Sequence, residues 1–178
     1  MLTAFFCYSA LEATAAIWAS SYLVQYRGIA EVTAARFASL FYLGITVGRF
    51  LSGFVSERLG DRRLIRLGTG TILLGILLIL LPLPSEFPAL AGLIVVGFGC
   101  APIYPSIIHS TPENFGKENS QAIIGIQMAG AYVGSTFMPP LFGLLTKLTG
   151  IGLYPVFLLF FCVLMLFTSE LQRKITAH

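Results

Sequence analysis

An acidic residue, Glu12, lies near the middle of the first long apolar run, where charged side chains are rare. Helical spacing places it on one face with small or polar neighbours, namely Tyr8, Ser9, Ala16 and Ala19. A carboxylate at membrane depth usually faces a cavity or a partner group, and desolvation favours its protonated form. This face is therefore expected to line a cleft for a small polar solute and to carry a proton, or else to join two helices through a paired carboxylate.

Four further residues are candidates for contact with a solute. Trp18 can stack on a sugar ring or lie at lipid depth. Tyr104 lies in the stretch PIYP, whose prolines bend or loosen a helix, and it either faces the cavity or anchors at the membrane surface. Gln127 and Ser135 share a broad helical face, on which Gln127 bonds a solute hydroxyl or a neighbouring helix.

The stretch GFVSERLGDRR, residues 53–63, concentrates charge between two apolar runs. Gly53 is expected to allow close helix approach, and Gly60 a sharp turn. Arg49 lies just inside the preceding run, and its expected partner is Glu57 or a carbonyl of a neighbouring helix. The other charged members of the stretch are Arg58, Asp61, Arg62 and Arg63.

The composition indicates a membrane protein. Of 178 residues, 56% are hydrophobic and 11% are charged, against about 25% charged in soluble domains. The net charge is +3, and no basic stripe with interleaved aromatics suggests nucleic-acid binding. Cys7, Cys100 and Cys162 lack disulfide or metal spacing and are expected to be core residues. We expect a single six-helix domain over 1–178, with spans at about 2–24, 33–55, 64–84, 87–108, 121–144 and 151–170.

The distribution of Lys and Arg predicts the orientation. Four arginines flank the loop between the second and third spans, namely Arg58, Arg62, Arg63 and Arg66. Because successive spans cross the membrane in opposite directions, Lys117, Arg173 and Lys174 fall on the same side as these arginines. The opposite side has only Arg27, Arg36 and Lys147. Because cytoplasmic loops carry the excess of positive charge, both termini are expected in the cytoplasm.

The charged stretch resembles the signature loop of the major facilitator superfamily, commonly Gly-x-x-x-Asp-Arg-x-Gly-Arg-Arg. Here it reads Gly53-x-x-x-Glu57-Arg58-x-Gly60-Asp61-Arg62-Arg63, with Glu57 for the usual Asp and Asp61 where a basic residue is common. The stretches GITVGRFLSG and GFGCAPIYPSIIHS look like the second and fourth helices of a facilitator half. AGAYVGSTFMPPLFGLL looks like the fifth helix of a carboxy-terminal half.

The resemblance is greatest to the sugar or fucose-permease-like branch of the family. It implies that this chain corresponds to helices seven to twelve of a twelve-helix transporter. It implies an all-α fold, a three-plus-three inverted repeat, with the solute between two rocking halves. The partners implied are a small polar solute, with or without protons, the lipid bilayer, and an amino-terminal half or a second copy; no cofactor is implied. An amino-terminal-half assignment stays open.

Two other classes of function were weighed. An intramembrane protease needs a general base at mid-depth, and neither His109 nor His178 lies there, so an enzyme is not expected. A non-transporting receptor or scaffold, or a truncated fragment of a transporter, stays open because a motif preserves fold better than activity. The expected location is a bacterial inner or plasma membrane.

Overall fold

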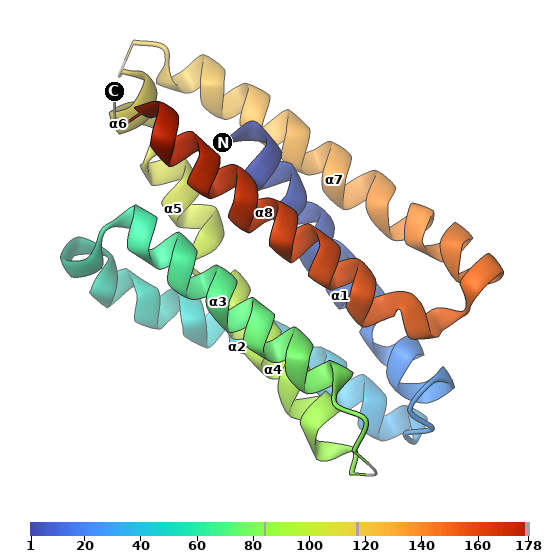
Figure 1. Ribbon diagram of the computed structural model, residues 1–178. Helices are drawn as coiled ribbons and strands as arrows, with labels where there is room; N and C mark the ends of the chain where they lie inside the picture. Colours follow the sequence, from blue (N-terminus) through green and yellow to red (C-terminus); the bar gives the residue numbers. More distant parts are fainter. Residues whose placement is uncertain (84, 117, 177–178) are drawn as a thin grey trace.

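The computed structural model is a bundle of helices that lie side by side (Figure 1). It describes residues 1–83, 85–116 and 118–176, and the side chains of these except Glu57 and residues 172–176. The helices are α1 (Leu2–Gln25), α2 (Glu31–Leu59), α3 (Asp61–Leu80), α4 (Phe87–Cys100), α5 (Ile103–His109), α6 (Thr111–Phe115), α7 (Ser120–Thr149) and α8 (Tyr154–Thr176), with a 3-10 turn η1 (Ile151–Leu153) before α8.

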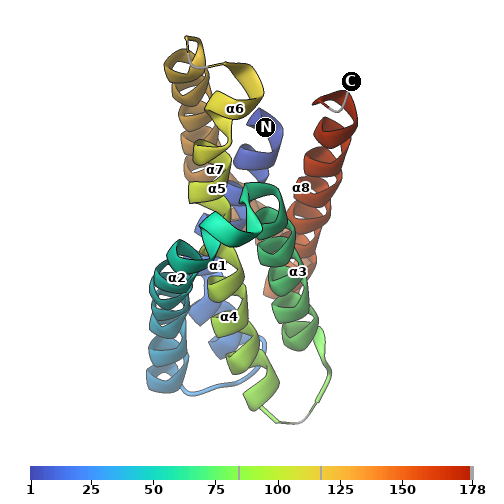
Figure 2. The same cartoon turned by 90° about the vertical axis from the view of Figure 1, so that its left-hand side faces the viewer.

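The N-terminus, the α2–α3 turn, α6 and the last turns of α8 lie at one end of the bundle, here called the turn end (Figure 1). The α1–α2, α3–α4 and α7–α8 connections lie at the opposite end (Figure 1). Helices α2, α3 and α4 form one group, and α1, α7 and α8 form a second group beside it (Figure 2). Within these groups α4 packs mainly against α2 and α3, and α1 mainly against α7 and α8.

Five helical stretches among the described residues are long and apolar enough to cross a membrane: Leu2–Gln25, Glu31–Ser56, Asp61–Leu80, Phe87–Phe115 and Ile151–Leu171. The remaining predicted span, 121–144, lies within α7, which has 30 residues but falls short in hydropathy. Its sequence explains the shortfall, because it contains Gln127, Pro139 and Pro140 together with several glycines, serines and threonines. A count from hydropathy alone is therefore one lower than the count of long helices.

Helix ends differ from the predicted span ends where capping decides them. Helix α2 continues to Leu59 and α7 to Thr149, several residues beyond 55 and 144, and each ends at a glycine with positive φ: Gly60 at +74° and Gly150 at +85°. Helix α3 ends at Leu80, four residues before the predicted end of its span. Hydropathy marks the residues in lipid, whereas a helix continues until its terminal backbone groups find other partners.

The prolines of the stretch PIYP break the fourth pass, as predicted. Helix α4 ends at Cys100 and α5 begins at Ile103. Pro102 has no N–H to offer the carbonyl of Phe98, which instead accepts a bond from Ala101 N at 3.3 Å. This break brings Tyr104 to the level at which α1 carries Glu12, since both residues line one cavity.

Candidate functional site

A cavity of about 290 Å³ lies between α1, α5 and α7, with one side chain from α2 at its edge. It brings together three of the six predicted solute-binding residues, Glu12, Tyr104 and Ser135. Two exposed tyrosines also line it: Tyr42 on α2 and Tyr132 on α7. This space, here called the central cavity, offers a carboxylate, three phenols and the hydroxyls of Ser9 and Ser135 on an otherwise apolar wall.

The carboxylate of Glu12 faces a cation. Oε1 of Glu12 lies 3.9 Å from an Nη2 nitrogen of Arg49 on α2, and the two side chains are 25% and 50% exposed. The expectation that Arg49 pairs with Glu57 or a carbonyl missed this partner; the Glu57 side chain lies outside the described part of the chain. The distance exceeds the roughly 2.7–2.9 Å of a charge-assisted hydrogen bond, so the pair is a loose one.

Tyr8 lies on the predicted face but not on the central cavity. It is fully buried one helical turn before Glu12, and it packs beside Phe5 with ring centroids 6.3 Å apart. Its buried hydroxyl has no hydrogen-bond partner within the described residues. Tyr8 therefore backs the carboxylate from inside the bundle rather than facing a solute.

Trp18 contacts α7. Its indole Nε1 donates to the carbonyl of Pro139 at 3.0 Å, and its ring meets Phe142 edge-on with centroids 5.3 Å apart. Gly143 leaves room for the indole, since a Cβ there would lie 2.8 Å from the ring. The structure thus places Trp18 away from the central cavity, as a link between α1 and α7.

Gln127 is buried at the junction of α6 and α7. Its Oε1 accepts from the Thr111 hydroxyl at 3.0 Å, while Nε2 has no partner among the described residues. Of the two roles weighed for this residue, the contact observed is the helix–helix hydrogen bond. Ser135, by contrast, lines the central cavity, although its hydroxyl donates to the carbonyl of Tyr132 in its own helix at 3.2 Å.

The turn between α2 and α3 consists of one residue. Gly60 has φ +74° and ψ 156°, a conformation that side-chain-bearing residues rarely adopt, so the predicted sharp turn is confirmed. Gly53 does not serve as predicted, because nothing lies within 4 Å of the position that its Cβ would occupy. The close approach of α2 to α4 occurs earlier, at Gly44 and Gly48.

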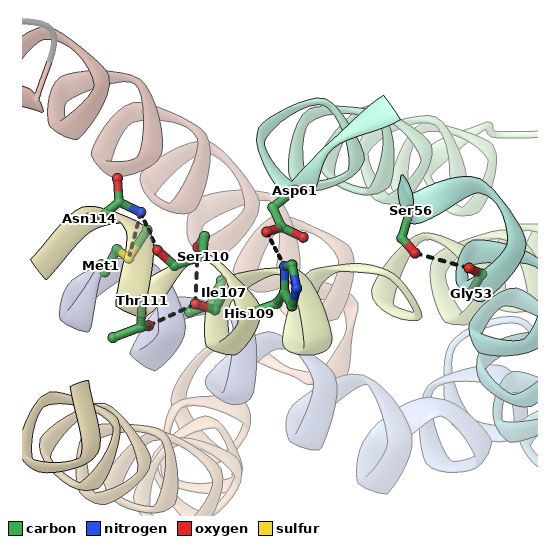
Figure 3. Close-up of polar contacts among 9 residues, drawn as sticks. All are labelled: Met1, Gly53, Ser56, Asp61, Ile107, His109, Ser110, Thr111 and Asn114. Atoms are coloured by element: carbon green, nitrogen blue, oxygen red, sulfur yellow. Dashed lines mark hydrogen bonds and ion pairs between the residues drawn. The ribbon is translucent and has the colours of Figure 1, made fainter. Parts of the chain in front are cut away.

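Side chains from the first turns of α3 tie it to other helices at the turn end. Oδ2 of Asp61 lies 2.7 Å from Nδ1 of His109 on α5 (Figure 3). Arg62 donates weakly to Asn114 of α6 at 3.4 Å, and Arg66 makes a bidentate pair with Glu170 of α8 at 2.5 and 2.6 Å. The remaining arginines of the predicted motif, Arg58 and Arg63, are exposed.

A second cavity of about 640 Å³ opens between α2, α3 and α5 toward the turn end. Its lining includes Arg49, Ser52, Asp61, His109 and Glu113, and it shares Tyr104 with the central cavity. We call it the end cavity. In the described part of the chain no group of three or more His, Cys, Asp and Glu residues is arranged to hold a metal ion.

The fold and these polar residues within apolar helices define an integral membrane protein of the α-helical class. The sequence matches the Major Facilitator Superfamily over residues 1–173, and the chain belongs to that family. Members of the family are generally transporters rather than enzymes.

A curated relative is similar to nearly the whole chain. The chain is 28% identical over 174 residues to "Bypass of stop codon protein 6" of Saccharomyces cerevisiae, an alignment that covers 93% of this chain and 35% of the relative. The chain therefore spans about a third of the length of the relative it matches.

The helix bounds observed in the structure, rather than the predicted spans, account for the pairing of Glu12 with Arg49. Glu12 lies ten residues from the start of α1, and Arg49 lies ten residues before the end of α2. At 1.5 Å per residue both lie about 15 Å from the turn end. Two opposite charges at equal depth on consecutive helices are natural partners, because each lowers the cost of placing the other in lipid.

Proposed function

We propose that this chain forms one half of a secondary active transporter that moves a small polar solute by alternating access. The observation that carries the proposal is the central cavity, whose carboxylate, phenols and serines lie on one side of a helical bundle. A sugar of the fucose-permease-like branch is the first solute to test, because it would match these hydroxyls, and Glu12 is the group that would carry a coupled proton.

Helix packing supports a three-plus-three inverted repeat. The first helix of each triplet packs mainly on the second and third helices of the other: α1 on α7 and α8, and α4 on α2 and α3. An exchange of this kind is expected from a pseudo-two-fold axis in the membrane plane. We place both termini in the cytoplasm, where the arginines of the turn end belong by the positive-inside rule.

A second wall is needed to enclose the solute. Helices α2 and α7 present large apolar side chains outward beside the central cavity, including Tyr42, Phe50, Tyr132 and Phe137, which are 57–68% exposed. Large apolar side chains that are exposed side by side are typical of surfaces that meet lipid or protein. An amino-terminal half, or a second copy of the chain, would close the cavity from this side. The bacterial membrane expected from the sequence gains no support from the comparison, since the relative is a yeast protein.

The test is uptake of labelled sugars into proteoliposomes that contain the chain alone or the chain with an amino-terminal half. We expect uptake only with both halves, and a strong loss of pH-driven uptake in Glu12→Gln. Uptake by the monomeric chain alone would contradict the two-wall proposal. Unchanged transport in Glu12→Gln would remove Glu12 from the site. Absence of transport of any solute in either form favours a non-transporting protein or a fragment.

A further inference from the structure

Arg49 belongs by position to the site around Glu12 rather than to the charged turn. It lies at the depth of Glu12, about 15 Å from the turn end by helical rise. Its guanidinium faces the Glu12 carboxylate at 3.9 Å across the α1–α2 contact. Its side chain is half exposed, and the cavity it lines shares Tyr104 with the lining of the central cavity.

The two charges can be neutralised in different ways. A guanidinium cannot release its proton in a protein, so Arg49 needs an anion or water at all times. A carboxylate at this depth is neutralised either by a cation or by a proton. When Glu12 takes up a proton, Arg49 therefore loses its anion and becomes a binding site for another one.

The other charged groups near Arg49 lie nearer the turn end. Asp61 and Glu113 line the same end cavity, and Asp61 is already held by His109 at 2.7 Å. The titratable groups that face Glu12 are Arg49 and Tyr42 from α2, Cys100 from α4, Tyr104 from α5, Tyr132 from α7 and Tyr8 on its own helix. Arg49 is the one basic side chain in this set.

From this geometry we infer that Arg49 binds the carboxylate of a small hydroxylated monocarboxylate, which replaces Glu12 when Glu12 is protonated. The proton leaves a hydronium ion, whose O–H bond breaks, and forms the O–H bond of Glu12; no other covalent bond forms or breaks. One proton and one monoanion cross together, so the step carries no net charge. The hydroxyls of Ser9, Tyr104 and Ser135 remain for the hydroxyls of the solute. This inference rests on the proposed function and narrows its solute class to acids.

The experiment uses the chain with its amino-terminal half in proteoliposomes and compares gluconate, glucuronate and lactate with glucose. We expect a pH gradient, acid outside, to drive accumulation of at least one anion, and an imposed membrane potential to leave it unchanged. Arg49→Gln should lose that uptake by roughly ten- to a hundred-fold, the ratio given by one lost charge-assisted hydrogen bond. Glu12→Gln should retain exchange of the anion across the membrane but lose its pH-driven accumulation.

The control is Arg36→Gln, which removes an exposed arginine near the other end of α2 and should transport normally. If Arg49→Gln fails to fold, the double variant Glu12→Gln/Arg49→Gln leaves no unpaired charge and should fold without transporting the anion. Transport of glucose that is independent of Arg49, or transport of none of the three anions, would overturn the inference. Glucose uptake of that kind would leave the proposed function intact, whereas the absence of all transport would end both.

Discussion

Helices α1 and α4 both pack between two neighbours, but they do so with different residues. Helix α4 contributes Gly92, Gly97 and Gly99, and added Cβ atoms at these positions would strike the backbone of α2 or α3. Helix α1 contains no glycine; its close contacts with α7 come from glycines of α7, such as Gly134. The backbones around α4 therefore approach one another through glycines on both sides, whereas the close approach of α1 to α7 depends on glycines of α7, such as Gly134, whose Cβ position lies 2.7 Å from the Phe6 carbonyl oxygen.

This difference separates a closely packed part of the bundle from one with room for a solute. The sequence of α4, FPALAGLIVVGFGC, carries no charged side chain, and its carbonyls lie against neighbouring glycines. Helix α1 carries Glu12 and Ser9, and the central cavity lies beside it. Glycine contacts on both helices of a pair leave little space between them, whereas contacts from one partner alone leave larger side chains to shape a cavity.

The largest effect on stability is expected at Gly97. A Cβ at this position would collide with the carbonyl oxygen of Phe41 on α2, and a backbone atom cannot move aside cheaply. Gly97→Ala should lower the free energy of unfolding by about 3 kcal/mol, the upper part of the range for overpacking. Unfolding in mixed detergent micelles measures it. Gly125→Ala, at a site with open space, is the matched control. Equal losses of unfolding free energy in the two variants would contradict the close backbone packing of α4.

A smaller loss is expected on the α1 side. The Cβ of Gly134→Ala would lie 2.7 Å from the carbonyl of Phe6, whereas that of Gly130→Ala would meet only the end of the Leu2 side chain at 2.7 Å. Gly134→Ala should cost about 2 kcal/mol and Gly130→Ala clearly less, because a flexible side chain can shift. The same unfolding measurement ranks them. A larger loss of stability in Gly130→Ala than in Gly134→Ala would contradict the interpretation that Gly134 meets the backbone of α1 and Gly130 only a flexible side chain.

Trp18 tests the polar link between α1 and α7. Trp18→Phe keeps an aromatic ring against Phe142 but removes the donor to the Pro139 carbonyl. The expected loss is about 1 kcal/mol, the usual net value of one hydrogen bond. Solute uptake in the assembled transporter should retain its solute preference, since the ring does not line the central cavity. A changed preference would instead place Trp18 at the solute.

The smallest effect should come from Gly53, beyond the part of α2 that contacts α4. Since open space surrounds its Cβ position, Gly53→Ala should raise stability by about 0.5 kcal/mol, the helix preference of alanine. Gly60→Ala, seven residues on, is the contrast, because φ +74° strains any side chain. A loss of stability in Gly53→Ala would show that its close approach involves a surface outside this chain.

Local chemistry made several features predictable. Gly60 was expected to form the turn, and the prolines around Tyr104 were expected to break their helix. The pairs Gly44–Gly48 and Gly130–Gly134 lie at the spacing of a small-residue stripe, and the structure packs them closely against neighbouring helices. Each depends on the backbone of its own segment or on a small-residue stripe at helical spacing. Such features survive without knowledge of the neighbour, because any neighbour benefits from a bare backbone.

The destination of long side chains was not predictable in the same way. Trp18, Gln127 and Arg49 each had more than one reasonable partner, and the partners found were Pro139, Thr111 and Glu12. Which partner a side chain meets depends on how each helix is rotated about its axis. Hydropathy constrains that rotation only weakly in lipid, where an apolar face has no preferred side.

The sequence by itself determined the apolar helices, the turn at Gly60, the break near Tyr104 and the position of Glu12 near the middle of an apolar helix. These follow from residue type, spacing and the need to satisfy backbone polar groups in the membrane. Only the tertiary structure decided that Arg49 faces Glu12 and that their surroundings form two cavities with Tyr104 in the lining of both. That pairing joins side chains on different helices, and its geometry exists only once α1, α2, α5 and α7 have packed against one another.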